Sequence, residues 1–325
     1  MSGFKTHVVY SFNDYIKLIR KLKENEPGLW FRGQNNASYQ LRPSAMREMW
    51  EISDHYGRVI EPTVLDRFHN RGTTVMYINQ FAMLEEFKEF AKEYIRFKPK
   101  HDLEWLFIAQ HYGIPTTLLD WTTDPLVALF FSKIDDNVII KNSDIEKAVE
   151  DFNQNPYSDL GSAIFAIDPG EYNKEAGEFY KNGDQSQKVD YPLNFEIDYN
   201  NLNDYSDNHV FPCFFTSTPI DKRICRQSGN FSIHGSMVWP IDHYDYHRSF
   251  IHKIFIPYKV YEEINEILNA LDINKKSIYG DSLLDNIALN IKKDQELKFK
   301  KQIEDLLEKY VTTPIEDRGY YSSLY

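Results

Sequence analysis

The chain has 325 residues, 42% of them hydrophobic and 26% charged, a composition typical of soluble globular proteins of one large or two ordinary domains. No apolar run approaches the roughly 18 residues of a membrane span, and the N-terminus lacks the features of a signal peptide, so we expect a cytoplasmic protein without a membrane partner. A net charge of −12 argues against broad electrostatic capture of nucleic acid. It leaves open a local basic groove or a basic partner. With two cysteines, Cys213 and Cys225, neither a disulfide framework nor a cysteine zinc site is expected.

Hydrophobic periodicity and turn residues predict the elements of the N-terminal part. We expect a helix capped by Ser11 or Asn13 and broken at Pro27-Gly28. The other elements expected here are a strand over His7–Phe12, a strand over Leu29–Arg32 that enters a turn at Gly33, and helices over Ala45–Ile52 and Asn79–Phe97.

The most informative stretch is HYGIPTTLLDWTTDPLVALFF, residues 111–131. It predicts a helix that is capped by Asp102 and ends at Gly113, where a left-handed residue belongs, with Pro115 preventing its continuation. A short strand over Thr116–Thr122 follows. Asp124 and Pro125 then start a helix that is apolar on all faces and therefore buried.

The C-terminal part predicts further strands and then helices. An Asp- and Asn-rich segment near 181–209 is expected to be a long irregular insertion. Strands are expected over Ser162–Ile167, Phe211–Thr216, Phe231–His234 and Lys253–Ile256. From Tyr258 onward we expect helices, the last over Ser282–Tyr310 with an apolar stripe at Leu297, Phe299, Ile303, Leu306 and Leu307. These elements predict an α+β fold: residues 1–257 form the main domain, and residues 258–325 form a helical extension packed on it.

Three polar clusters are candidates for a ligand site. In the first, Arg32 ends a strand, where its guanidinium can bind a phosphate, and Gly33 lets a ligand approach the backbone; alternatively, Arg32 pairs with a structural carboxylate. In the second, Asp120 and Thr122 end another strand and offer hydrogen bonds to a ligand, unless they serve the backbone and turn. Trp121 fits the core better than a site.

The third cluster is the end of the helix at His111 and Tyr112, and a separate segment with polar candidates is RICRQSGNF, residues 223–231. Tyr112 or Trp121 could stack on a planar ring, and His111 could transfer protons or be structural. Gln227 would face either a ligand or solvent.

Together these residues resemble the FRG domain family, whose Phe-Arg-Gly triplet is Phe31-Arg32-Gly33 here. The resemblance covers roughly residues 10–290. It is carried by WFRGQ with the later LRPS, by QHYGIPTTLLDWTTDPLVALFF, by RQSGNF and by KIFIP. One departure is Thr117, which stands where the family usually has Arg.

A more distant resemblance is to ADP-ribosyltransferases of the arginine–serine–glutamate type. Phe31-Arg32-Gly33 is similar to their aromatic-Arg-Gly strand, and Asp120-Trp121-Thr122 falls where their Ser-Thr-Ser strand belongs. That resemblance implies a mixed split sheet that clamps NAD, with helical elements at both ends of the chain. It implies Arg32, Thr122 and Gln227 as catalytic residues, no metal, and NAD contacts from Arg32, Gly33, Gln34, Tyr112, Asp120 and Trp121.

The third motif of those enzymes departs most from this chain. They use a Glu on a late strand, whereas RQSGNF offers Gln227, an amide that cannot act as a general base. Either a carboxylate from elsewhere takes the role, with Asp120, Glu85 and Glu86 as candidates, or the chemistry is altered, or the fold only binds.

The resemblance therefore implies an ADP-ribosyltransferase-like toxin or phage-defence effector that modifies a protein or nucleic acid. A neutralising antitoxin or immunity protein is the expected partner, and the charged C-terminal helix is a reasonable surface for it. Two other functions stay open: a nucleotide-sensing module without turnover, and a nuclease-like enzyme, for which the sequence shows no carboxylate cluster at diagnostic spacing.

Overall fold

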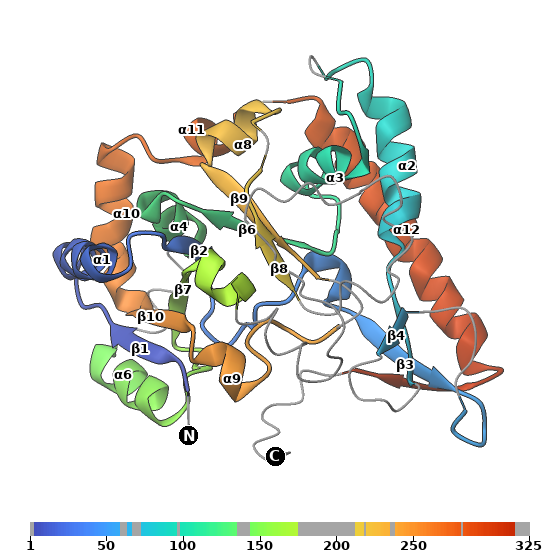
Figure 1. Ribbon diagram of the computed structural model, residues 1–325, viewed down its shortest axis with the longest axis horizontal. Coiled ribbons are helices and arrows are strands. Elements are labelled where there is room, and N and C mark those ends of the chain that lie inside the picture. The colour runs from blue at the N-terminus through green and yellow to red at the C-terminus, as the bar shows by residue number, and fades with distance from the viewer. Residues whose placement is uncertain are drawn as a thin grey trace.

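The computed structural model describes residues 3–58, 64–66, 73–95, 98–134, 144–174, 212–217, 219–234, 238–280 and 282–315. A seven-stranded sheet forms the centre of the molecule (Figure 1). Its strands, in spatial order, are β1 (Lys5–Val8), β10 (Ile251–Pro257), β7 (Gly161–Ile167), β2 (Trp30–Gln34), β6 (Leu118–Thr122), β9 (Gly229–Ile233) and β8 (Cys213–Phe215). Only β1 and β10 run parallel, so the sheet is mixed and the expected α+β class is confirmed.

The sheet is nearly divided between β2 and β6. Every residue of β2 pairs with β7, but on its other side β2 meets β6 at a single pair, Phe31 opposite Thr122. β6 continues as a full ladder with β9. The backbone groups of β2 and β6 beyond that pair therefore need other hydrogen-bond partners.

Two groups of helices cover one face of the sheet, on either side of this division (Figure 1). The strands β10, β7 and β2 pack against α1 (Phe12–Asn25), α4 (Pro125–Phe131) and α10 (Tyr261–Ala270). The strands β6, β9 and β8 pack against α2 (Gln80–Ala91), α3 (Asp102–His111) and α12 (Leu284–Leu307). The division between β2 and β6 thus lies where the two cores meet.

The opposite face carries a third core made of alternate residues of the same strands. Trp30, Trp121 and Phe165 belong to it, and the ring of Phe255 stacks on Phe152 of α6 (Ile145–Gln154) at 4.3 Å between centroids. Period-two alternation sends the odd and even residues of each strand to opposite faces. Burial on both faces explains why β7 and β10 consist mostly of apolar residues. The exceptions in β10 are His252 and Lys253, and the buried ammonium of Lys253 donates to the carbonyl of Ala37 at 2.8 Å.

A second, four-stranded antiparallel sheet corrects one expectation. Its order is β11 (Val311–Pro314), β3 (Met49–Ser53), β5 (Thr73–Tyr77) and β4 (Val64–Asp66). The predicted helix over Ala45–Ile52 is wrong: Ser44–Met46 form the short 3₁₀ helix η1, and the rest is β3. Hydrogen bonds to β5 and β11, distant in the sequence, override the local helical pattern.

Most predicted helix starts are confirmed by their caps. Ser11 accepts the amide of Asp14 at the start of α1, and Asp124 accepts the amides of Leu126 and Val127 at the start of α4. The cap of α3 is His101 instead of Asp102, whose carboxylate binds Lys88 of α2. The predicted strand over His7–Phe12 ends earlier, at Val8.

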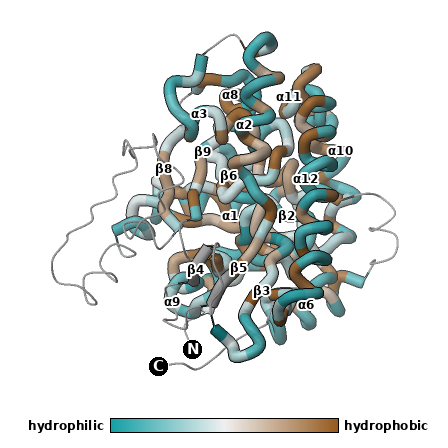
Figure 2. Tube along the Cα trace, turned by 90° about the vertical axis from the view of Figure 1, so that its right-hand side faces the viewer, coloured by the Kyte–Doolittle hydropathy of each residue, from teal (hydrophilic) through white to brown (hydrophobic). Residues whose placement is uncertain are grey.

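The C-terminal segment is helical as expected up to Leu307 and contributes to both helix groups, but Val311–Pro314 form the strand β11. The 3₁₀ helix η3 (Tyr258–Val260) leads into α10, and α11 (Lys275–Tyr279) precedes α12. Figure 2 shows hydrophilic and hydrophobic residues alternating along α10 and α12. The apolar stripe predicted for α12 is only partly right: Phe299 and Ile303 are buried, but Leu297 and Leu307 are 69% and 51% exposed.

Three helices of the described part were not predicted: α6, and the short helices α8 (Lys222–Arg226) and α9 (Asp245–Arg248). The predicted insertion at 181–209 lies outside the described residues. Among the helices of the described part, none is long and apolar enough to span a bilayer.

Candidate functional site

A cavity of about 280 Å³ opens where β2 and β6 stop pairing. Residues from β2, α3, β6, α4, β9 and α11 and the C-cap of α8 meet in it, although they are far apart in the sequence. Its lining comprises Phe31, Arg32, Gly33, Gln110, His111, Gly113, Asp120, Trp121, Thr122, Phe131, Gln227, Gly229 and Tyr279. Arg32, Thr122 and Gln227, which the resemblance implied as catalytic residues, therefore all line one cavity. Their chemical roles remain predictions.

Arg32 spans the gap between the two strands. Its Nη1 donates to the backbone carbonyl of Asp120 at 2.7 Å and lies 3.7 Å from the carboxylate of the same residue. Its Nε is buried and makes no hydrogen bond. Burial lowers the pKa of the guanidinium to about 10, although the Asp120 carboxylate acts in the opposite direction. Arg32 is therefore a charged group at neutral pH with donor capacity left for a ligand.

A chain of hydrogen bonds holds the Asp120 carboxylate in place. Gln110 of α3 donates from Nε2 to Asp120 Oδ2 at 2.8 Å, and its own Oε1 accepts the hydroxyl of Thr116 at 2.6 Å. Thr116 in turn donates its backbone amide to Ser44, the last residue of the LRPS segment. This segment thus supports the site from behind, and the Asp120 side chain, 35% exposed, remains accessible from the cavity.

Thr122 fastens the end of β6 to the turn that carries Gln227. Its hydroxyl donates to the Gln227 carbonyl at 2.6 Å and accepts the Asp124 amide at 3.0 Å. It therefore positions the Gln227 backbone, and both of these hydrogen bonds lie within the protein. Gln227 is buried at the C-terminus of α8. The left-handed residue after it is Ser228, with φ 45°, and Gly229 already belongs to β9.

His111 contributes an imidazole ring to the cavity, and one of its two ring nitrogens has no hydrogen-bond partner. The ring is 93% buried, and its Nε2 makes no hydrogen bond. Burial lowers the pKa of the imidazole despite the nearby Asp120 carboxylate, so His111 is neutral at pH 7. Because unpaired buried polar atoms are rare, a ligand atom would be a natural partner for this nitrogen.

The role of Gly33 differs from the one expected. A Cβ at this position would overlap the carbonyl oxygen of Ala128 and lie 2.7 Å from the amide of Ser132. Gly33 is therefore required because α4 packs directly on β2, and a ligand need not approach it. Gln34 does not line the cavity; it is buried and donates to the carbonyl of Gln40 at 3.3 Å.

The two aromatic residues proposed to stack on a ligand point elsewhere. The indole of Trp121 packs on Phe214 in the third core and donates to Ser232 at 3.0 Å. Tyr112 lies outside this cavity and stacks on the guanidinium of Arg223. Tyr279, which sequence reasoning missed, lines the cavity instead. Its position in a charged C-terminal segment gives no sign of this, because only tertiary packing brings α11 to the site.

Two candidate carboxylates lie away from the cavity. Glu85 pairs with Lys88, and Glu86 accepts a hydrogen bond from Gln295 of α12. Both sit on α2, outside the lining, so Asp120 is the remaining candidate of the three. Within the described residues, no three His, Cys, Asp or Glu side chains form a group that could hold a metal ion.

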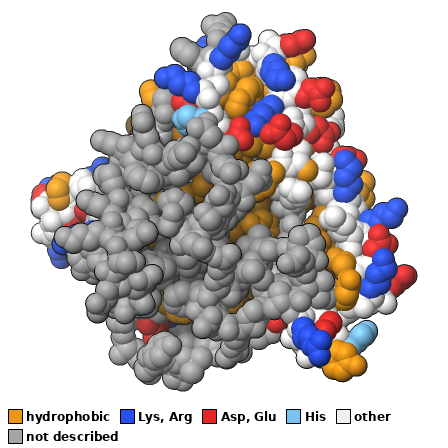
Figure 3. Space-filling view, turned by 45° about the vertical axis from the view of Figure 1, so that its right-hand side comes forward, with side chains coloured by type: hydrophobic (Ala, Val, Ile, Leu, Met, Phe, Trp, Pro, Cys, Tyr) orange, Lys and Arg blue, Asp and Glu red, His pale blue; other side chains and the backbone are white. Residues whose placement is uncertain are grey.

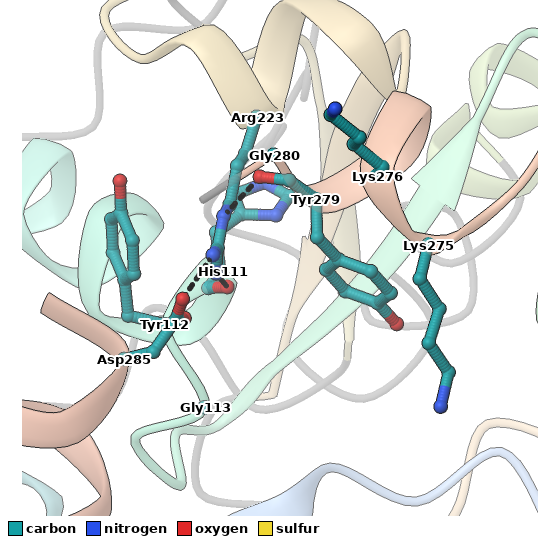
Figure 4. Close-up of a pocket in the computed structure, with 9 residues that line it drawn as sticks. All are labelled: His111, Tyr112, Gly113, Arg223, Lys275, Lys276, Tyr279, Gly280 and Asp285. Atoms are coloured by element: carbon teal, nitrogen blue, oxygen red, sulfur yellow. Dashed lines mark hydrogen bonds and ion pairs between the residues drawn. The ribbon is translucent and has the colours of Figure 1, made fainter. Parts of the chain in front are cut away.

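A second cavity of about 490 Å³ adjoins the first and shares His111, Gly113 and Tyr279 with it (Figure 4). Arg223 forms its inner wall. The guanidinium donates to the carbonyls of Tyr279 and His111 at 2.6 and 2.9 Å and binds Asp285 at 2.6 Å. It thereby ties α3, α8, α11 and α12 together, and its donors are used within the protein.

Comparison with protein families identifies one match. Residues 27–138 match the family model of the FRG domain. The match contains the WFRGQ and QHYGIPTTLLDWTTDPLVALFF segments, whereas RQSGNF and KIFIP lie outside it. Comparison with curated proteins gives no match, and neither does comparison with solved structures.

Proposed function

We propose that this protein binds NAD at the division between β2 and β6 and transfers ADP-ribose from it to a macromolecule. The observation that carries the proposal is the meeting of Arg32, Asp120 and His111 in one cavity at the end of β6. It brings together a cation, a carboxylate and a neutral imidazole, which are the groups that such a transfer needs. A mixed sheet with a gap at this point is also what the distant ADP-ribosyltransferase resemblance implies.

In the proposed reaction the bond between the ribose C1′ and the nicotinamide nitrogen breaks, and its electron pair leaves with neutral nicotinamide. A bond forms between C1′ and a nucleophilic atom of the acceptor, whose proton passes to a base in the site. The Asp120 carboxylate lies where it can stabilise the positive charge that develops on the ribose. Asp120 or the neutral His111 can accept the proton.

The remaining residues position the substrate. The guanidinium of Arg32 offers its free donors to the phosphate or ribose oxygens of the nucleotide. The amide of Gln227 is suited to hydrogen bonds with ribose hydroxyls. Tyr279 provides the aromatic ring that Trp121 and Tyr112 do not. A cavity of about 280 Å³ suits the nicotinamide and its ribose, but a whole dinucleotide needs more room.

The biological setting follows from the resemblance: a toxin or phage-defence effector. Uncontrolled transfer of ADP-ribose would damage the cell that makes it, so we propose a neutralising partner protein. The exposed face of α12 is a candidate surface for it.

The test uses NAD labelled in its adenine ring and a cell lysate. Incubation with the protein should transfer the label to macromolecules, and separate treatment with nuclease and with protease should show which class accepts it. A variant with Asp120→Asn should leave the lysate unlabelled, whereas Asp305→Asn, on an exposed position of α12, should label it as the wild type does. Absence of label in every fraction, with nicotinamide release at background, would reject the transferase.

A second candidate function is a nucleotide sensor without turnover. It is favoured by the hydrogen bond that Arg32 makes within the protein, to the backbone carbonyl of Asp120 on β6, and by the amide at position 227, where the transferases have a carboxylate. Saturable NAD binding without release of nicotinamide, in the presence of lysate, would establish the sensor over the enzyme.

A further inference from the structure

The second cavity has the position expected of a continuation of the first. The two share His111, Gly113 and Tyr279, so a ligand that extends past these residues passes from one into the other. With about 490 Å³ the second cavity is also the larger, and it has no role in the reaction described above.

One wall of this cavity is built on a fixed helix. The carbonyl of Tyr279, the last residue of α11, accepts the Arg223 Nε at 2.6 Å. Arg223 is itself buried and stacks on Tyr112, with its guanidinium carbon 4.3 Å from the ring centroid. At its other end α11 is closed by a capping box at Asn274 and Ser277. Side chains on α11 are therefore presented from a rigid support.

Three cationic side chains lie at this cavity. Lys275 and Lys276 line it and extend to either side of Tyr279 (Figure 4). The guanidinium of Arg226 lies against Gly280, another lining residue, so closely that a Cβ there would overlap it. Asp285, the one carboxylate among the described lining residues, is bound to Arg223. Within the described part of the chain, none of the three cations has an ion-pair partner.

This grouping lies on a chain with a net charge of −12. On the face drawn in Figure 3 the described cations and anions are interspersed, and on α12 Lys292 pairs with Glu296 and Lys298 with Asp294. Unpaired cations around a concave surface raise the local concentration of anions. His111 lies at the junction of the two cavities, and its Nε2 has no hydrogen-bond partner. This neutral polar atom does not repel an anion as a carboxylate would.

We propose that the second cavity is a diphosphate subsite, in which Lys275, Lys276 and Arg226 hold the phosphates of a dinucleotide. Three cations can balance the two negative charges that a dinucleotide carries on its diphosphate. The proposal rests on the proposed function only for the nicotinamide end of the ligand, which occupies the first cavity. His111 and Tyr279 then contact the ligand between its two halves.

The test measures binding without turnover, with ADP-ribose and inorganic pyrophosphate as probes in isothermal titration calorimetry. The double variant Lys275→Gln, Lys276→Gln should weaken ADP-ribose binding about tenfold or more, because charged hydrogen bonds to phosphate are lost. Arg226→Gln should weaken it in the same direction. The matched control is Lys300→Gln, Lys301→Gln, a pair of adjacent exposed lysines on α12, which should bind as the wild type does.

Unfolding is not expected to confuse the result, because Lys275 and Lys276 are exposed and unpaired, and thermal melting of each variant checks this. Pyrophosphate should compete with ADP-ribose in the wild type, and adenosine should not. Wild-type affinity in the Lys275/Lys276 variant, equal weakening in the control pair, or no binding of either probe to the wild type would each overturn the subsite. This test does not measure release of nicotinamide. It can therefore reject the diphosphate subsite without rejecting the transferase, and the transferase can be rejected without rejecting the subsite.

Discussion

The guanidinium of Arg32 donates to the backbone carbonyl of Asp120 at 2.7 Å, across two strands that share only the pair Phe31 and Thr122. A side chain thus supplies a hydrogen bond that an amide of β2 would give in a continuous sheet. The same contact brings the cation within 3.7 Å of the Asp120 carboxylate. Arg32 therefore has two roles: it closes the gap in the sheet and places a charge in the cavity.

Replacement of Arg32 by Ala should weaken both binding and stability. Loss of a charged contact to a phosphate or ribose oxygen removes about 1.5–3 kcal/mol, so the Kd for NAD should rise roughly 10- to 100-fold. The unbonded Asp120 carbonyl should lower the free energy of unfolding by about 1–3 kcal/mol. Calorimetry on folded protein and urea denaturation measure the two effects.

The control for this variant is Arg20→Ala, which removes an exposed arginine of α1 that pairs only with Glu24. It should change neither quantity, because exposed ion pairs contribute little. If Arg32→Ala loses stability but binds NAD with wild-type affinity per folded molecule, Arg32 is a structural residue alone.

Replacement of Gly33 by Ala should destabilise the fold. The added methyl group meets the backbone of α4 at Ala128, which cannot yield as a flexible side chain would. We expect the free energy of unfolding to fall by about 3 kcal/mol. Gly3→Ala, where nothing lies within 4 Å of the added atom, is the matched control and should be neutral in the same urea titration. Equal midpoints for the two variants would show that α4 is not packed on β2 as described.

The Gln227 side chain should matter more for the rate than for binding. If its amide bonds the nicotinamide ribose as the ribosyl cation develops, Gln227→Ala lowers kcat at least tenfold and leaves KM within a few-fold. Its carbonyl, held by Thr122, is unaffected by the substitution. The comparison is Gln154→Ala at the end of α6, remote from the cavity. A rise in KM with unchanged kcat would assign Gln227 to ground-state binding.

Buried neutral histidines should make the protein sensitive to acid. Burial lowers the pKa of His247 to about 4 and that of His234 to about 3, from about 6.5 in the unfolded chain. Between pH 6.5 and 4 the unfolded chain therefore binds protons that the folded chain does not. The free energy of unfolding should fall as the pH is lowered through this window, by about 3 kcal/mol for His247 alone, and stay level above pH 7.

Urea denaturation at pH 7.5 and pH 5 measures this slope. His247→Gln removes one titrating group and should flatten the slope, whatever it does to stability at pH 7.5. His55→Gln, at an exposed position, should leave the slope unchanged. A slope that is equal in the wild type and His247→Gln would contradict a neutral buried imidazole at this position.

The sequence predicts the central fold well where local signals agree with tertiary packing. Asp124 and Pro125 mark the start of α4, and Gly113, with φ 91°, ends α3 as its position indicated. The mostly apolar segments of β7 and β10 form strands that are buried on both faces. The same local signals fail at Ala45–Ile52, where pairing with β5 decides the structure.

The candidate site could be predicted only in part. The ends of strands and helices can be predicted from turn residues in the sequence. Such ends carry Arg32, Asp120 and Gln227. Trp121 and Tyr112 also lie near such ends. The alternation of side chains along β6 directs Trp121 into the third core, and the guanidinium of Arg223 covers the ring of Tyr112. Tyr279 reaches the cavity because Arg223 holds its backbone, a contact between residues 56 apart that no local pattern indicates.

The most direct test of the proposed function compares Asp120→Asn with the wild type in two assays, NAD binding and nicotinamide release in the presence of the labelled acceptor fraction. The amide keeps the size of the carboxylate and can still accept from Gln110, so the cavity should stay intact. We predict NAD binding within a few-fold of wild type and nicotinamide release lowered at least a hundredfold, about 2.7 kcal/mol of transition-state stabilisation. Nicotinamide release by Asp120→Asn at the wild-type rate would contradict the assignment of Asp120, and with it the proposed mechanism.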